Sequence, residues 1–221
     1  MVYVPAGNFL MGSEISDRNQ KPQHKVFLDA FWIDQTEVTN AQYQECVKDG
    51  ACGSLQESDY LTDAKYNDHP VIYLSWDEAQ IFCTWAGKRL PTEAEWEKAA
   101  RGDDGRTYPW GNTKPNSGLL NYLDNKKSST KVGSFPAGAS PYGALDMAGN
   151  VWEWTADWYA PDYYKTSPNR NPTGPVEGSR RIVRGGSWLS PIEIVIRTYF
   201  RKALNPETRN YTTGFRCAWS E

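Results

Sequence analysis

The residues that could catalyse a reaction or bind a metal through nitrogen or sulfur are few: two histidines, His24 and His69, and four cysteines. The histidines lie far apart in the sequence, so this chain alone cannot assemble a zinc site of three histidines or an iron site of several. No Gly-x-Ser-x-Gly motif is present, and Gly186-Ser187-Trp188 is not one. Serine-hydrolase chemistry is therefore disfavoured.

The cysteines suggest a disulfide. Cys46 and Cys52 lie six positions apart, across the end of an expected helix and the loop after it. A disulfide closing that small loop is geometrically reasonable and would indicate an extracytoplasmic setting; the alternative is two unrelated small residues. Cys83 falls on the apolar face of an expected helix and Cys217 in an expected C-terminal strand. Because cysteine is often buried, we expect both in the core.

Composition narrows the class of protein. The chain has 221 residues, of which 39% are hydrophobic and 23% charged, and a net charge of −3. It has no run of 18 apolar residues and no excess of positive charge, so we expect neither a membrane-spanning helix nor nucleic-acid binding. The start, Met1–Pro5, lacks the regions of a signal peptide. That start does not exclude a domain cut from a secreted or larger protein.

The charge is uneven along the chain. Residues 177–221 carry eight basic and four acidic side chains, which leaves this segment at +4 and the remainder at −7. Two interpretations are open. The arginines either bond carbonyls and carboxylates inside the domain or form a surface for an acidic partner. Binding to such a partner would depend steeply on salt.

Helix signals are clear in the first half of the chain. Three capping boxes, each followed by a helical apolar pattern and then a glycine, predict helices near 40–49, 75–86 and 92–101. The boxes are Thr39 with Gln42, Ser75 with Glu78, and Thr92 with Glu95.

Strand signals are short. They are Phe9–Met11, Lys25–Leu28, Phe31–Ile33, Ile182–Arg184 and Gly214–Trp219. Between Arg101 and Glu177 the chain is rich in Gly, Pro, Asn, Asp and aromatic residues and has few periodic runs. Because those aromatics can be buried, we expect a loop-rich domain pinned by them. No repeat or linker is evident, so residues 1–221 are read as one domain.

The segment 146–154 could bind calcium. If it is extended, Val151 and Glu153 share one face, and Trp152 and Trp154 share the other. Burial of the tryptophans would leave the Glu153 carboxylate near backbone carbonyls, and calcium prefers such hard oxygen ligands. Alternatively, Glu153 caps a turn or pairs with an arginine.

Several segments stand in a characteristic order along the chain. They include Gly149-Asn-Val-Trp-Glu-Trp154, Arg184-Gly-Gly-Ser-Trp188 and Gly214-Phe-Arg-Cys217, and the others are residues 5–13, 37–40, 85–97 and 108–111. Together they resemble the formylglycine-generating-enzyme family, also called the sulfatase-modifying-factor domain. The resemblance spans nearly the whole chain. It implies an α+β class, with a complex fold of little regular structure built on a C-type-lectin-like core.

The resemblance also implies structural calcium. One Ca²⁺ would bind the backbone oxygens of Asp146, Gly149 and Val151 and the side chain of Glu153. A second would lie near Asn121 and Tyr122, with Asp124 as a further candidate.

Family enzymes hold copper(I) with two cysteines soon after Arg-Gly-Gly-Ser. Here Ser190 stands in place of the first, and Val195 or a neighbour in place of the second. Copper(I) requires soft thiolates, and no cysteine occurs between Arg184 and Arg216. The related iron-dependent sulfoxide synthases need a histidine cluster, which is also missing. We therefore expect no copper and a catalytic function that is lost or was never present.

The active-site groove of the family would lie over residues 188–213. Cysteine-free relatives include the variable proteins of diversity-generating retroelements, which alter C-terminal positions to change what they bind. The corresponding candidates here are Trp188, Leu189, Ser190, Glu193, Thr198, Tyr199, Asn205, Thr208, Asn210 and Tyr211. Ile192, Ile194 and Ile196 instead follow the alternation of a core strand.

Two functions remain open. The first is a non-catalytic, calcium-stabilised module that binds a protein or other ligand. The second is a family enzyme, or an accessory factor, that acts on sulfatase-type cysteine peptides with altered chemistry. Sugar binding of the lectin kind is weaker, because neither a Glu-Pro-Asn nor a Gln-Pro-Asp triplet is present.

Overall fold

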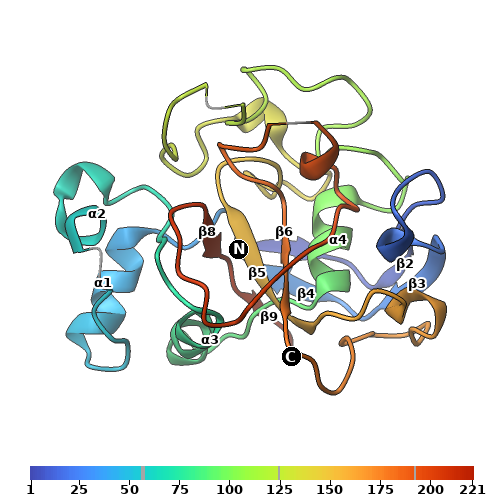
Figure 1. The fold of residues 1–221 in the computed structure, drawn as a ribbon, viewed down its shortest axis with the longest axis horizontal. Coiled ribbons are helices and arrows are strands. Elements are labelled where there is room, and N and C mark those ends of the chain that lie inside the picture. The colour runs from blue at the N-terminus through green and yellow to red at the C-terminus, as the bar shows by residue number, and fades with distance from the viewer. Residues whose placement is uncertain (56–57, 124, 192) are drawn as a thin grey trace.

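The computed structural model describes residues 1–55, 58–123, 125–191 and 193–221 (Figure 1). The α-helices are α1 (Asn40–Lys48), α2 (Ser58–Thr62), α3 (Trp76–Trp85) and α4 (Glu93–Arg101). The strands are β1 (Val2–Val4), β2 (Gly7–Met11), β3 (His24–Leu28), β4 (Phe31–Ile33), β5 (Trp152–Trp158), β6 (Arg181–Arg184), β7 (Lys202–Leu204), β8 (Thr213–Phe215) and β9 (Ala218–Trp219). Short 3₁₀ helices also occur among these described residues: η1 (Arg18–Gln20), η2 (Ala64–Tyr66), η3 (Pro136–Gly138), η4 (Tyr163–Lys165) and η5 (Glu193–Ile196).

The helices predicted near 40–49, 75–86 and 92–101 are confirmed as α1, α3 and α4, and each begins with its capping box. In α4, the hydroxyl of Thr92 accepts a hydrogen bond from the Glu95 N–H at 3.1 Å. The Glu95 carboxylate accepts one in return from the Thr92 N–H at 2.8 Å. These reciprocal bonds satisfy two helix-terminal donors that would otherwise lack partners.

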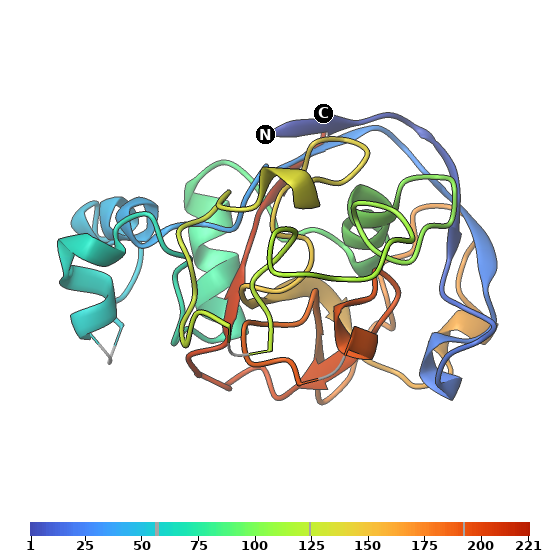
Figure 2. The same ribbon diagram turned by 90° about the horizontal axis from the view of Figure 1, so that it is seen from above.

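The strands form three small sheets. The largest has the order β7-β6-β5-β8, in which β5 pairs antiparallel with β6 and parallel with β8. β2 and β3 form a hairpin, and β1, β4 and β9 form a third sheet that brings the two ends of the chain to one side (Figure 2). The first four residues of β5 are buried on both faces of the sheet, so this strand lies in the core.

Two strand predictions need correction. The predicted strand Gly214–Trp219 is split between β8 and β9, which belong to different sheets. Between them Cys217 bonds Asp34: its N–H donates to the Asp34 carboxylate at 3.0 Å, and its carbonyl accepts from the Asp34 N–H at 2.8 Å. These bonds fix the chain at the point where it passes from the sheet of β8 to the sheet of β9.

The alternating isoleucines do not form a strand either. Ile194 and Ile196 lie in η5, and Ile192 lies outside the described residues. Ile196 is buried and Ile194 is half-buried. The Thr198 N–H that follows donates to the Thr107 carbonyl, so this segment pairs with a distant loop instead of extending a sheet.

Two disulfides bond all four cysteines. One joins Cys46 to Cys52, the pair predicted from spacing, and the other joins Cys83 of α3 to Cys217. Cys83 and Cys217 are buried in the core, as expected. The bond between them was not predicted, because folding brings them together from 134 positions apart. Both disulfides lie in the core cluster that packs α1 and α3 against β5 and β8.

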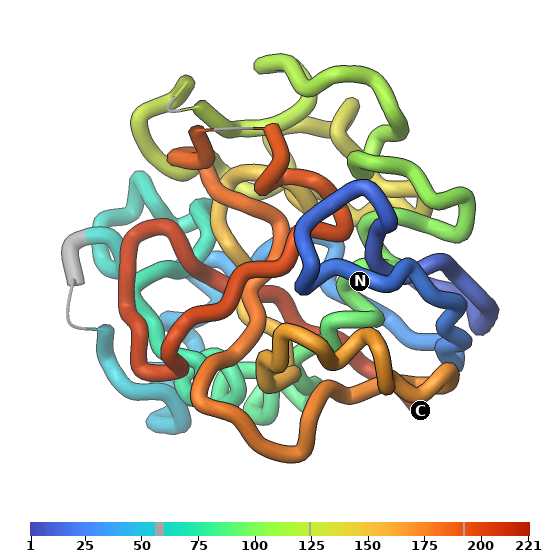
Figure 3. Tube along the Cα trace, turned by 45° about the vertical axis from the view of Figure 1, so that its right-hand side comes forward, coloured from blue at the N-terminus to red at the C-terminus, as the bar shows by residue number. Residues whose placement is uncertain are grey.

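The long segment between α4 and β5 runs over one end of the molecule, and the segment after β6 crosses its face (Figures 1 and 3). Aromatic residues anchor the segment between α4 and β5. Its buried Tyr108 and Tyr122 belong to one core cluster with Ile196, and Tyr108 also stacks on Trp110 with ring centroids 5.2 Å apart. In the described part of the chain, no helix is long and apolar enough to cross a bilayer.

Candidate functional site

A groove of about 530 Å³ opens beside β5 and β7, between the segment after β6 and the loop before β8. Its walls include Trp152, Leu189, Ser190, Val195, Lys202 and Tyr211. Ser190, and Val195 or a neighbour, are the positions that the resemblance assigns to the copper cysteines, and Ser190 and Val195 line one groove. A hollow of similar volume beside Arg89 and Glu95 contains none of the predicted site residues.

Two glycines after β6 shape this groove. Gly185 and Gly186 have φ values of 93° and 78°, which L side chains rarely adopt. A Cβ on Gly186 would also lie 2.7 Å from the side chain of Ile196. The same Cβ would lie 3.1 Å from the Ser190 hydroxyl and 3.2 Å from the Val195 carbonyl oxygen. The glycine therefore lets positions 190 and 195 come close together.

Neither side chain at these two positions is a soft-metal ligand. The buried Ser190 hydroxyl accepts a hydrogen bond from the Ser187 N–H at 2.8 Å, so it stabilises the turn. Val195 offers only an alkyl side chain. Because every cysteine of the chain is in a disulfide, the groove holds no thiolate for a soft metal.

Buried arginines beside the groove form ion pairs with glutamates of α4. Arg184 donates to Glu97 at 2.6 Å and to Glu93 at 3.1 Å. Arg201 binds both carboxylate oxygens of Glu93, at 2.7 and 2.9 Å. At the same helix terminus, Asp157 accepts the Glu93 N–H at 2.7 Å. For Arg184 and Arg201, the interpretation of internal bonding is confirmed.

Four of the predicted ligand-binding residues line the groove: Leu189, Ser190, Asn210 and Tyr211. Trp188 lies half-buried next to the groove, with its ring centroid 6.0 Å from that of Tyr211. Its buried indole N–H has no hydrogen-bond partner among the described residues.

The other five candidates do not line the groove. Thr198 and Tyr199 are buried, because the Thr198 hydroxyl bonds the Arg106 and Thr107 carbonyls and the Tyr199 ring packs on Arg101. Glu193 is exposed at the start of η5. Asn205 and Thr208 form a turn after β7, in which the Asn205 carbonyl accepts the Thr208 N–H.

Sequence reasoning missed Trp152, Phe200 and Lys202 as parts of the groove. Lys202 could have been suspected from its place among the basic residues of the C-terminal segment. Trp152 was expected to be buried, but nothing local in the sequence indicated that it would meet that lysine.

At the first predicted calcium site, Glu153 is already bonded. Arg216 donates to both of its carboxylate oxygens, at 2.6 and 2.7 Å, and the Trp96 indole donates at 2.7 Å. Arg216 also donates to the carbonyls of Asp34, Gln35 and Leu145. Pairing of Glu153 with an arginine, one of the alternatives left open above, is therefore what the structure contains.

The charge around Arg216 is nevertheless unbalanced, because the buried carboxylates of Glu37, Asp146 and Glu153 face one guanidinium. Burial raises the pKa of the Glu37 carboxyl well above its ordinary value, and the charges of Asp146 and Glu153 raise it further. Burial also raises the pKa of Asp146. One oxygen of Glu37 has no hydrogen-bond partner within the described ranges.

The two predicted calcium regions are adjacent. The Asn150 N–H donates to the Asn121 carbonyl at 2.9 Å, and Gly149 packs closely against that carbonyl. The buried side-chain oxygen of Asn121 lacks a partner in the described part of the chain. Tyr122 is buried and donates to the Pro115 carbonyl, and Asp124 lies outside the described residues.

The oxygen donors and the buried carboxylates of this region suit a calcium ion, but both carboxylate oxygens of Glu153 are already bonded to Arg216. In the described residues, no three histidine, cysteine or carboxylate side chains gather in a group that could hold a metal ion. A calcium ion would depend on backbone oxygens for most of its ligands, which calcium accepts.

The sulfatase-modifying factor enzyme 1-like domain matches residues 1–221. The chain belongs to this family. It is 32% identical to the formylglycine-generating enzyme of Streptomyces coelicolor, over 98% of this chain and 88% of the enzyme. It is 39% identical to the serine/threonine-protein kinase pkn1 of Chlamydia caviae, over 99% of this chain. The chain spans 37% of that kinase's length.

The family's fold extends to a variable protein. Variable protein 1 of Treponema denticola has a similar structure, with a TM-score of 0.82 and 26% identity, over 99% of this chain and 94% of that one. The expected α+β, C-type-lectin-like fold with little regular structure is confirmed.

Proposed function

We propose that this family member is a non-catalytic module that binds a protein or other ligand in the groove beside β5 and β7. The observation that carries the proposal is a groove without a thiol. It is lined by Ser190, which is bonded to its own turn, and by Val195, while every cysteine of the chain is in a disulfide. The resemblance places the copper cysteines of the family's enzymes at Ser190 and at Val195 or a neighbour. The chain therefore has a groove at these positions but no free thiol in it to bind a soft metal.

Likeness to variable protein 1 supports a binding role, because the two structures agree over nearly all of both chains. We propose that this chain is the variable protein of a diversity-generating retroelement. A reverse-transcriptase gene beside a repeated copy of the 3′ coding segment would be expected. A sulfatase gene in that place would argue for the alternative.

That alternative is a family enzyme or accessory factor that acts on sulfatase-type cysteine peptides. The identity of 32% to the Streptomyces coelicolor enzyme over most of both chains favours it. The identity to the chlamydial kinase concerns about a third of that protein, so kinase chemistry is not part of either proposal.

An activity assay separates the two. The disulfide-intact domain would be incubated with copper(I), oxygen and a cysteine-containing sulfatase peptide, with the Streptomyces coelicolor enzyme as positive control. We expect no formylglycine by mass spectrometry, and turnover above a copper-only blank would overturn the binding-module proposal.

We also propose structural calcium near Asp146, Gly149 and Val151, where the backbone oxygens would be the ligands. Bound calcium would favour the ionised forms of Glu37 and Asp146, whose pKa values burial raises. The two disulfides are consistent with an extracellular setting, and we propose that the domain works there.

A further inference from the structure

Lys202 differs from its basic neighbours in the fold. Arg184, Arg201 and Arg216 each make an ion pair with a buried carboxylate. Several lysines elsewhere also pair with acids, among them Lys48 with Glu45 at 2.6 Å. Lys202 makes no ion pair with any described residue, and it lines the groove.

An aromatic ring holds the Lys202 ammonium in place. Lys202 is the first residue of β7 and pairs in register with Val183 of β6. Its Nζ lies 4.7 Å from the ring centroid of Trp152, which comes from β5. Burial lowers the pKa of Lys202, and no carboxylate in the described chain is close enough to raise it. An ammonium that has lost water without gaining a counter-ion favours a ligand that brings one.

The rest of the groove leaves that charge uncompensated. No Asp or Glu is among its described lining residues, although the whole chain carries a net charge of −3. Arg201 adds no free charge, because Glu93 binds it through both carboxylate oxygens. The remaining walls are apolar or neutral, with Leu189 and Tyr211 at 37% and 47% exposure.

We infer that Lys202 binds a carboxylate on an acidic side chain of a partner polypeptide whose apolar neighbours pack on Leu189 and Tyr211. This inference rests on the proposed binding function and names its ligand class. An open groove with exposed walls suits a chain segment, because small molecules usually bind in pockets that enclose most of their surface. The carboxylate would form a charge-assisted hydrogen bond in a partly desolvated place, where such bonds are strong.

The test uses the intact, ¹⁵N-labelled domain and three capped pentapeptides, acetyl-Leu-Ala-Xaa-Ala-Leu-amide, with Xaa as Glu, Gln or Lys. Binding is followed at the indole signals of Trp152 and Trp188, each assigned by substitution with Phe. We expect the Glu peptide to bind at least about tenfold more tightly than the Gln peptide, because only Glu supplies a charged acceptor.

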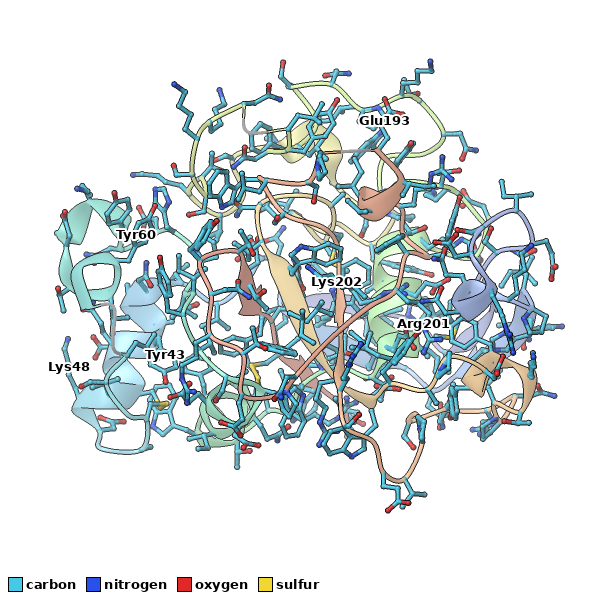
Figure 4. All side chains as sticks on the ribbon, in the orientation of Figure 1. Tyr43, Lys48, Tyr60, Glu193, Arg201 and Lys202 are labelled. Atoms are coloured by element: carbon cyan, nitrogen blue, oxygen red, sulfur yellow. A yellow bond between two sulfur atoms is a disulfide. The ribbon has the colours of Figure 1, made fainter. Side chains whose placement is uncertain are left out.

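Variants locate the effect. Lys202→Met keeps the alkyl stem over Trp152 and should abolish the preference for Glu, whereas Lys202→Arg keeps the charge and should retain it. The matched control is Lys48→Met, at an exposed lysine of α1 far from the groove, which should leave the preference unchanged (Figure 4).

Each other outcome overturns the inference. Equal affinity for the Glu and Gln peptides, a preference for Lys, or no shift with any peptide would refute carboxylate binding at Lys202. Capped N-acetylglutamate amide binding as tightly as the Glu pentapeptide would refute the assignment to a polypeptide. The proposed function fails separately, because formylglycine turnover is measured on the unaltered domain with a sulfatase peptide and uses none of these peptides or variants.

Discussion

Removing each disulfide in turn should destabilise the domain by different amounts. The Cys46–Cys52 bond closes a loop of sequence separation 6, and the Cys83–Cys217 bond one of separation 134. In the chain-entropy account, a cross-link stabilises a protein by restricting its unfolded state, and more so for a longer loop. That account gives about 2 kcal/mol for the short loop and about 5 kcal/mol for the long one.

The two double variants, Cys46→Ala/Cys52→Ala and Cys83→Ala/Cys217→Ala, are matched because both remove two buried sulfurs. Equilibrium urea unfolding of each would give the loss in unfolding free energy relative to the wild type. Since small domains are stable by only about 5–15 kcal/mol, loss of the long-range bond should bring the domain near its stability limit. Equal losses, or a larger loss for the Cys46–Cys52 pair, would refute the reasoning.

Three further predictions concern buried charge and metal. Glu153→Gln removes the carboxylate that binds the buried Arg216 guanidinium through both oxygens, and it should lower the unfolding free energy by about 3–5 kcal/mol. Glu95→Gln, at a part-exposed pair with Arg89, should lower it by about 1 kcal/mol or less. Similar losses for the two variants in urea unfolding would contradict this. Burial, aided by the charge of Glu93, raises the pKa of Asp157 well above its ordinary value. The stability that the protonated Asp157 carboxyl contributes is therefore present below about pH 4 and is lost as the pH rises through the pKa of the folded state. Asp157→Asn should therefore gain stability relative to the wild type between pH 4 and 8 in urea unfolding, and a difference independent of pH would show that this carboxyl does not titrate as argued. Calcium added back to exhaustively chelated protein should raise Tm in a concentration-dependent way, and an unchanged Tm would remove the calcium proposal.

The local parts of the fold could be predicted from the sequence. The capping box of Thr39 with Gln42 spans four residues, so its signal does not depend on tertiary structure. Cys46 and Cys52 are likewise close in sequence. Strand β7 was missed, because its three half-buried residues are a strand only through their pairing with Arg181–Val183 of β6. The Cys83–Cys217 bond was missed because sequence spacing says nothing about a contact formed across most of the chain.

The site was predictable only in outline. Positions 190 and 195 were found through the resemblance, and both line the groove. Lys202 was not singled out, because its position depends on a ring from β5. Thr198 was assigned to the groove, yet its hydroxyl bonds loop carbonyls near residue 107, which no local pattern shows.

Copper(I) affinity of the disulfide-intact protein is the most direct test of a groove without soft-metal ligands. It would be measured by competition with a chromogenic copper(I) chelator in ascorbate, beside the variant Ser190→Cys/Val195→Cys. We predict that the wild type leaves the chelator complex intact and that the variant withdraws copper from it, because Gly186 lets the two positions come close. Stoichiometric copper(I) binding by the wild type would contradict the account.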